Sequence, residues 1–329
     1  MHTAEMRLLA TTLTLALTAA PLMGVAQDPR PTFRAAVDRV TVAATVRDKR
    51  GRPVTTLKVA DFHLLDNGQP QQILEFARDK APMSIALLAD FSGSMDVAAK
   101  RGASRDVVEQ MMAWLTTGED RVGLYAFDQE LEEVQPLEPA PGRILEKMDR
   151  LEPWGKTRLF DAIAETGRRL AASGAGRRAV VVLTDGDDNA SQLTPAEVSA
   201  IASSIDVPVY IIVIVSPLDR VGKTSNSVID PQLAQHRDGA LGDLARWTGG
   251  DILVPVTAAD ASVATRQIVT ELREQYLIAF EPRREPGWHP LELRTTKTNL
   301  VVRARSGYLV RSQPAPLLHH STDSEPKTR

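Results

Sequence analysis

The stretch IALLADFSGS, residues 85–94, decides the fold class. Its first five residues are all apolar, as expected of a strand that is covered on both faces of a parallel sheet. The five residues that follow carry a carboxylate and two hydroxyls. Ligands of doubly wound sheets bind at the carboxyl ends of the strands. The stretch therefore predicts a buried parallel strand that leads directly into a binding loop.

From Pro82 onward, further apolar runs alternate with helical patterns. The runs lie at 122–127, 179–183, 207–215 and 252–254, and the helical patterns at 107–115, 159–172, 195–203, 241–247 and 258–274. Thr194 and Pro195 are the expected N-cap and first residue of one helix. This alternation predicts an α/β fold with a doubly wound, mainly parallel sheet and helices on both faces, spanning residues 82–275.

The segments on either side of this unit are rich in strand signals. Residues 35–80 contain VTVAATV at 40–46 and an Asp-Asn-Gly turn at 66–68, which is typical of a β-hairpin. Residues 276–311 contain strand patterns separated by Pro, Gly and Asn turns. The simplest packing joins both segments in one small β-sandwich-like domain, and two independent β appendages are the alternative. The polar residues 312–329 are expected to be disordered.

The N-terminus has the pattern of a secretory signal peptide. Arg7 precedes an uncharged stretch from 8 to 23, and the small residues of Gly24-Val25-Ala26 suit cleavage before Gln27. A transmembrane anchor is the alternative. No later stretch is long and apolar enough to span a membrane. We therefore expect residues 1–26 to be removed, leaving an exported protein, periplasmic or secreted, with no integral membrane segment.

Composition excludes several functions. The chain of 329 residues has no cysteine, which rules out disulfides, thiolate zinc sites and cysteine catalysis. Its formal net charge is −3, and its basic residues are scattered rather than clustered, so no nucleic-acid partner is expected. The GKT sequences at 155–157 and 222–224 lack the first glycine of a phosphate-binding loop.

Three predicted loops offer oxygen ligands at one edge of the sheet. Asp90, Ser92 and Ser94 follow the first strand, Asp185 follows the strand at 179–183, and Thr157 lies in a loop that enters a helix. If the first loop is extended, residues two apart point the same way and can converge. Carboxylates and hydroxyls are hard ligands that suit Mg²⁺, Mn²⁺ or Ca²⁺ better than zinc or copper.

These motifs resemble the metal-ion-dependent adhesion site of von Willebrand factor type A domains. The matching patterns are DFSGS at 90–94, GKTRLFDA at 155–162 and TDG at 184–186, and all five motif positions are filled. The resemblance covers about residues 82–275. The flanking sequences VRDKRGRPV at 46–54 and RARSGY at 303–308 resemble the bacterial "VWFA-related" family first defined in acidobacteria.

The resemblance implies a protein that binds its partner through the metal. Asp90 and Asp185 would roughly neutralise a divalent cation, most simply Mg²⁺, and an acidic residue of a protein partner would complete its coordination. Lys156 and Arg158 could steer that partner or could be solvated surface charges. Phe91 and Trp154 could be exposed contacts near the metal or core residues.

The sequence therefore predicts an exported, non-enzymatic binding or adhesion-type protein. Two alternatives remain open. A Mg²⁺-dependent enzyme or enzyme subunit would need a base beside the site, for which Asp128 and Asp187 are candidates by loop position. A structural envelope scaffold would use the metal only to stiffen its loops.

Overall fold

The computed structural model describes residues 39–78, 81–96, 99–174, 176–204, 206–215 and 239–310. The predicted signal peptide at 1–26 and the predicted tail at 312–329 lie outside these ranges. Among the described residues, no helix has the length and apolar character needed to cross a membrane.

Within the described ranges, the α/β unit is built on a sheet of six strands in the order β10-β9-β8-β5-β6-β7. All neighbours pair parallel except β6 and β7, which are antiparallel. The predicted doubly wound, mainly parallel sheet is confirmed. The strands are β5 (Met83–Asp90), β6 (Arg121–Phe127), β7 (Leu131–Pro139), β8 (Arg177–Thr184), β9 (Val209–Val213) and β10 (Ile252–Leu253).

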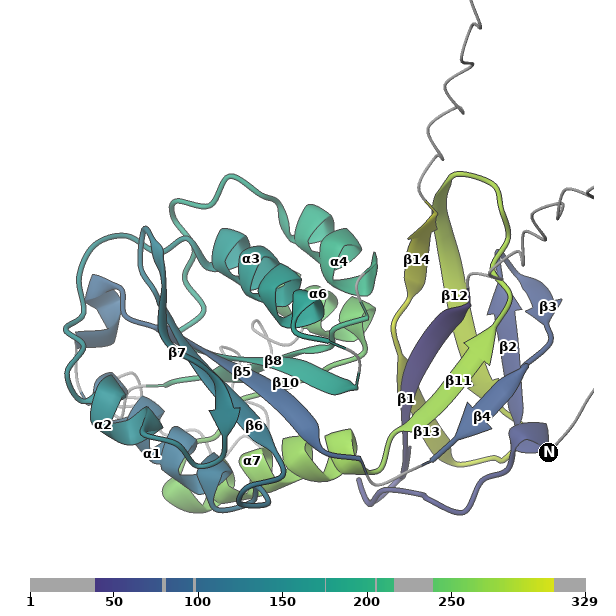
Figure 1. Cartoon of the computed structure of the whole chain (residues 1–329), viewed down its shortest axis with the longest axis horizontal. Coiled ribbons are helices and arrows are strands. Elements are labelled where there is room, and N and C mark those ends of the chain that lie inside the picture. Colours follow the sequence, from purple (N-terminus) through teal and green to yellow (C-terminus); the bar gives the residue numbers. More distant parts are fainter. Residues whose placement is uncertain are drawn as a thin grey trace, which may run out of the picture. The chain divides into compact units, whose positions relative to one another are not determined.

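Helices cover both faces of this sheet (Figure 1). Side chains alternate across a strand, so Ile85 and Leu87 of β5 pack with one helical layer while Ala86 and Leu88 pack with the other. This explains why the run at 85–89 is apolar at every position. The first layer contains α1 (Lys100–Met112), α2 (Ile144–Met148) and α7 (Ala258–Arg273), and the second contains α3 (Leu159–Ala172), α4 (Pro195–Ser204) and α6 (Ala240–Thr248).

The ends of two helices follow from local chemistry. The Thr194 hydroxyl accepts a hydrogen bond from the backbone N–H of Glu197 (3.3 Å), whose carboxylate accepts one from the Thr194 N–H (2.8 Å). This capping box confirms the predicted start of α4. Helix α6 is followed by its C-cap Gly249, where φ is +85°. A Cβ at Gly249 would lie 2.9 Å from the Arg305 nitrogen, so this close approach requires glycine.

Strand β7 and helix α2 are not among the predicted elements. Strand β7 contains Pro136 and three glutamates, and its register with β6 shifts near Gly123, which obscures the alternation expected of a strand. Proline and charge are tolerated there because β7 is at the edge of the sheet. Helix α2 has five residues, too few to establish a helical period.

The flanking segments share two further sheets, with strand orders β13-β1-β11-β4 and β14-β12-β2-β3 in the described part of the chain. Each sheet combines strands from before and after the α/β unit, and β1 pairs with both β11 and β13. The strands are β1 (Val40–Asp48), β2 (Phe62–Asp66), β3 (Gln69–Gln71), β4 (Glu75–Ala77), β11 (Tyr276–Phe280), β12 (Gly287–Thr295), β13 (Leu300–Ala304) and β14 (Gly307–Val310).

The two sheets enclose their own apolar core. Val42, Leu64 and Phe280 are buried together, and Phe62 and Tyr276 form a second cluster in which their rings are 5.2 Å apart. The predicted hairpin joins β2 and β3, and both central residues of its turn, Asn67 and Gly68, have positive φ. This conformation is the one that Asn-Gly sequences favour.

A buried cluster of charges connects the sandwich strands to the α/β unit. Glu271 of α7 is only 3% exposed and is paired with Arg47 of β1 and Arg303 of β13. The hydroxyl of Tyr210 in β9 donates a hydrogen bond to the same carboxylate (3.1 Å). Because the charges of Glu271 and the arginines are removed from water, each depends on its partners for stabilisation.

Candidate metal site

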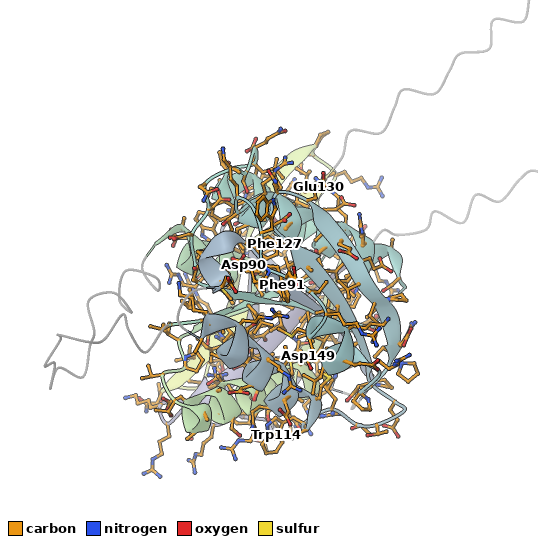
Figure 2. The ribbon with its side chains drawn as sticks, turned by 90° about the vertical axis from the view of Figure 1, so that its left-hand side faces the viewer. Asp90, Phe91, Trp114, Phe127, Glu130 and Asp149 are labelled. Carbon is orange, nitrogen blue, oxygen red and sulfur yellow. The ribbon has the colours of Figure 1, made fainter. Side chains whose placement is uncertain are left out.

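Asp90 is the last residue of β5 and is 2% exposed. Its Oδ1 accepts a hydrogen bond from the backbone N–H of Ser92 (2.9 Å), and its Oδ2 accepts one from the hydroxyl of Thr184 (2.7 Å). The carboxylate is therefore held between the ends of two adjacent parallel strands, β5 and β8. Figure 2 shows Asp90 and Phe91 close to Phe127, whose carbonyl accepts a hydrogen bond from the Phe91 N–H (2.8 Å).

Burial raises the pKa of Asp90 to about 6. Removal from water is the largest cause, because it penalises the charged carboxylate. Hydrogen bonds from Ser92 and Thr184 act in the opposite direction, and the negative charge of Asp185 adds to the increase. Asp90 thus carries a charge that its immediate surroundings stabilise incompletely.

Ser92 and Ser94 are brought together by a turn. Ser92 is 1% exposed and Ser94 is partly exposed, and their hydroxyl oxygens are hydrogen-bonded at 3.1 Å. The prediction of an extended loop was wrong, because η2 (Gly93–Asp96) is a 3-10 turn. The buried Met95 anchors this turn, and its N–H donates to the Ser92 carbonyl (2.9 Å). The hydroxyls meet because the turn folds back, not because alternate side chains share a face.

Thr157 comes from the loop before α3 and is 2% exposed. Its N–H donates to the side-chain oxygen of Asn189 (3.0 Å), and its carbonyl accepts from the N–H groups of Asn189 and Ala190. The backbone is thus fixed by the loop that follows β8. The Thr157 hydroxyl makes no hydrogen bond to any of the residues that the structure describes, which leaves its lone pairs available.

Backbone hydrogen bonds join the Thr157 loop to the loop after β5. The Trp154 N–H donates to the Phe91 carbonyl (2.7 Å), and the Gly93 N–H donates to the Gly155 carbonyl (3.2 Å). Together with the contacts of Thr157 to Asn189, these bonds connect all three predicted loops. Their relative positions are therefore set by the backbone as well as by the candidate ligands.

Asp185 follows β8 directly, and its carboxylate is largely buried. Its Oδ1 lies 3.4 Å from the N–H of Asp187. Its Oδ2 accepts a hydrogen bond at 2.9 Å from the ammonium group of Lys100, the first residue of α1. Lys100 is not among the predicted site residues. No local signal marked it, because the helical pattern read from the sequence begins only at residue 107, whereas α1 begins at Lys100.

The candidate ligands form an all-oxygen set of two carboxylates and three hydroxyls. No group of three or more His, Cys, Asp or Glu side chains that could hold a metal occurs within the described ranges. A metal at this edge would therefore depend on the hydroxyls. The unpaired Thr157 hydroxyl and the mutually bonded Ser92 and Ser94 hydroxyls leave lone pairs free for a cation. The donor set fits a hard divalent ion such as Mg²⁺.

The surrounding side chains differ in exposure. Phe91 is 6% exposed and belongs to the core, whereas Trp154 is 74% exposed. Arg158 is paired with Asp161 (2.7 Å), so its charge is already compensated, and Lys156 is exposed. Of the residues weighed as partner contacts, Trp154 and Lys156 are the ones that face solvent.

The two residues considered as candidate bases have different environments. The carboxylate of Asp128 accepts a hydrogen bond from the backbone N–H of Glu130 (2.8 Å), which stabilises its own turn. Asp187 is exposed, and its N–H points at the carboxylate of Asp185.

Comparisons with known proteins relate the α/β unit to one domain family. Residues 85–187 match the family model for the von Willebrand factor type A domain. No curated protein is significantly similar in sequence to the chain.

Similar solved structures include three bacterial proteins. An aerotolerance-related membrane protein from Bacteroides fragilis NCTC 9343, carrying multiple mutations to serine, is 17% identical and has a TM-score of 0.41, with 58% of this chain and 99% of that chain covered. The conserved hypothetical protein BatB from Bacteroides thetaiotaomicron is 16% identical, with a TM-score of 0.44 and coverage of 58% and 98%. A von Willebrand factor type A protein from Catenulispora acidiphila is 13% identical, with a TM-score of 0.45 and coverage of 85% and 76%.

The matched range begins in β5 and ends just after β8, and it includes Asp90, Ser92, Ser94, Thr157 and Asp185. The sheet order and the two helical layers agree with this assignment. Residues 85–187 therefore form part of a von Willebrand factor type A domain.

Proposed function

We propose that the protein is a non-enzymatic binding protein that recognises a partner through a divalent cation held by Asp90, Ser92, Ser94, Thr157 and Asp185. One observation carries this proposal. Hydrogen bonds join the three loops that carry these oxygen-bearing side chains, and Asp90 and Asp185 lie at the carboxyl ends of β5 and β8. This is where parallel sheets of this kind bind ligands.

The five residues divide into two roles. Asp90 and Asp185 supply the negative charge, and the buried position of Asp90 makes a cation an effective means of stabilising it. Ser92, Ser94 and Thr157 supply neutral oxygens. A bound Mg²⁺, or Mn²⁺ or Ca²⁺ in its place, would offer a remaining coordination position to a carboxylate of the partner.

The exposed side chains beside the site suggest the character of the partner. Trp154 lies three residues before Thr157 and is 74% exposed, which is unusual for so large an apolar side chain. Lys156 is exposed on the same loop. Exposed tryptophans are frequent anchors of protein interfaces. We propose a protein partner with an acidic residue next to an apolar one.

The proposal includes export to the periplasm or the exterior, which rests on the signal-peptide pattern at residues 1–26. Mass spectrometry of the native protein tests it. A mature chain beginning at Gln27 is expected, and an intact segment 1–26 would contradict cleavage.

The metal is tested by calorimetric titration of Mn²⁺ and Mg²⁺ into protein that has been stripped with EDTA. Wild type and Asp187→Asn should bind one ion, because Asp187 is exposed and outside the donor set. Asp185→Ala should not bind. Equal binding by Asp185→Ala and wild type would refute the site.

The partner is tested by retention of proteins from envelope extracts on immobilised wild type, Asp185→Ala and Asp187→Asn, each in Mg²⁺ and in EDTA. The expected partner is retained by wild type and Asp187→Asn in Mg²⁺ alone. If wild type in EDTA and Asp185→Ala in Mg²⁺ retain the same proteins as wild type in Mg²⁺, recognition does not depend on the metal.

A further inference from the structure

Lys100 occupies the position of a counter-ion within the candidate metal site. Its ammonium group lies 2.9 Å from Oδ2 of Asp185, and the two side chains are only 14% and 6% exposed. Most ion pairs between surface side chains are weak because water screens them, but this pair is largely shielded. A positive charge thus stands beside one of the two carboxylates that the proposed cation needs.

The local structure around Lys100 is unfavourable without that contact. Lys100 is the first residue of α1, whose first turn contains no acidic residue, and a cation at this end opposes the helix dipole. The preceding Ala99 has φ +66° and provides no side-chain cap. A non-glycine residue in this left-handed conformation is sterically strained. The pair with Asp185 offsets the unfavourable position of the Lys100 charge at the start of the helix.

We propose that Lys100 is a built-in counter-cation of the metal site, which a divalent ion must displace from Asp185 in order to bind. This inference rests on the proposed function. In the metal-free protein, Lys100 stabilises Asp185 beside the buried carboxylate of Asp90. On metal binding, the contact between Lys100 and Asp185 is lost. Lys100 therefore stabilises the empty form and weakens the affinity for metal, and so sets the cation concentration at which the site fills.

Loss of the Lys100 charge should lower the stability of the metal-free protein but raise its affinity for metal. A purely structural role of Lys100 would not predict the gain in affinity. Lys100→Met removes the charge and keeps the length of the side chain. In EDTA the variant should melt at a lower temperature than wild type, because the carboxylates of Asp90 and Asp185 lose their cation. Its affinity for Mn²⁺ should nevertheless be about 10-fold tighter, since no ammonium has to be displaced.

The matched controls are Lys156→Met and Lys100→Arg. Lys156 is exposed on the Thr157 loop, so its loss removes the same charge near the site without removing a contact to Asp185. Lys156→Met should leave the melting temperature in EDTA unchanged. It should change the Mn²⁺ affinity by less than about 2-fold. Lys100→Arg keeps the charge and should bind Mn²⁺ about as weakly as wild type. If Lys100→Met fails to fold, Lys100→Gln serves in its place.

Displacement is also visible without any variant. Amine acetylation followed by mass spectrometry should modify Lys100 faster in saturating Mg²⁺ than in EDTA, while Lys156 reacts at the same rate in both. Equal Mn²⁺ affinity of Lys100→Met and wild type, or slower acetylation of Lys100 in Mg²⁺, would overturn the counter-cation role and leave the metal site intact. The absence of Mn²⁺ binding in both wild type and Lys100→Met would overturn the proposed function itself.

Discussion

Replacing Asp90 with asparagine should make the metal-free protein more stable at neutral pH. The variant keeps the size of the side chain and removes the buried charge. Its amide oxygen can accept the hydrogen bond from the Ser92 N–H, and its NH₂ group can donate to the Thr184 hydroxyl. The main change is therefore electrostatic, in a side chain that is almost fully buried.

The magnitude follows from the pKa of Asp90, which rises from 3.8 to about 6 on folding. A raised carboxyl pKa means that the folded protein binds the proton more tightly than the unfolded chain does. The stability that Asp90 contributes is thus greatest below pH 3.8 and is lost as the pH rises through about 6. Each pKa unit corresponds to about 1.4 kcal/mol, so the ionised carboxylate costs about 3 kcal/mol at neutral pH.

Loss of charged hydrogen bonds in Asp90→Asn offsets about 1–2 kcal/mol of this gain. The expected net gain at about pH 7.5 in EDTA is about 1–2 kcal/mol, and the difference from wild type should shrink or reverse by about pH 4.5. Urea unfolding at both pH values measures it. Asp187→Asn, an exposed control, should differ from wild type by less than about 0.5 kcal/mol throughout. A wild type that is more stable than Asp90→Asn by the same margin at both pH values would refute the reasoning.

Three further substitutions test other features. Glu271→Gln should destabilise the protein by about 3 kcal/mol in urea, because it removes the carboxylate paired with Arg47 and leaves Arg303 with Asp251 alone. A loss below about 1 kcal/mol would contradict that role. Thr194→Ala should cost about 1 kcal/mol by removing the cap of α4, whereas Thr194→Ser should cost little, and equal losses would argue against the capping box. Trp154→Ala should leave the melting temperature and the Mn²⁺ affinity unchanged while weakening the affinity for the metal-dependent partner by about 10-fold or more. Unchanged retention of the partner would show that Trp154 is not part of the interface.

Patterns that repeat along the chain predicted most of the α/β fold. The run at 85–89 is apolar at every position because it packs against two helical layers, and that requirement is visible in sequence. Strand β7 was not predicted, because a strand at the exposed edge of a sheet does not have to be apolar at every position. The motif spacing identified the five candidate ligands, since the ends of parallel strands meet at one edge of a sheet.

The parts of the site that sequence reasoning missed depend on contacts between distant residues. The meeting of Ser92 with Ser94 follows from a turn anchored by Met95 in the core, and the loop after β5 alone does not specify that turn. Lys100 reaches Asp185 across 85 residues of sequence, so no local pattern marks the pair. The exposure of Trp154 and the burial of Phe91 are likewise tertiary properties, because either residue could pack in a core.

The interleaving of the sandwich strands has a consequence for the order of assembly. Strand β1 emerges early in synthesis but pairs with β11 and β13, so neither sheet can be completed until the α/β unit has been made. Folding of that unit brings its ends together, since Arg177, which pairs with Met83 at its start, contacts the carbonyl of Gln275 at its end. A flexible loop of about 200 residues is thereby replaced by a short one, which lowers the entropic cost of closing the sandwich by about 2–3 kcal/mol. The folded α/β unit thus brings the strands that precede it and the strands that follow it close enough to pair.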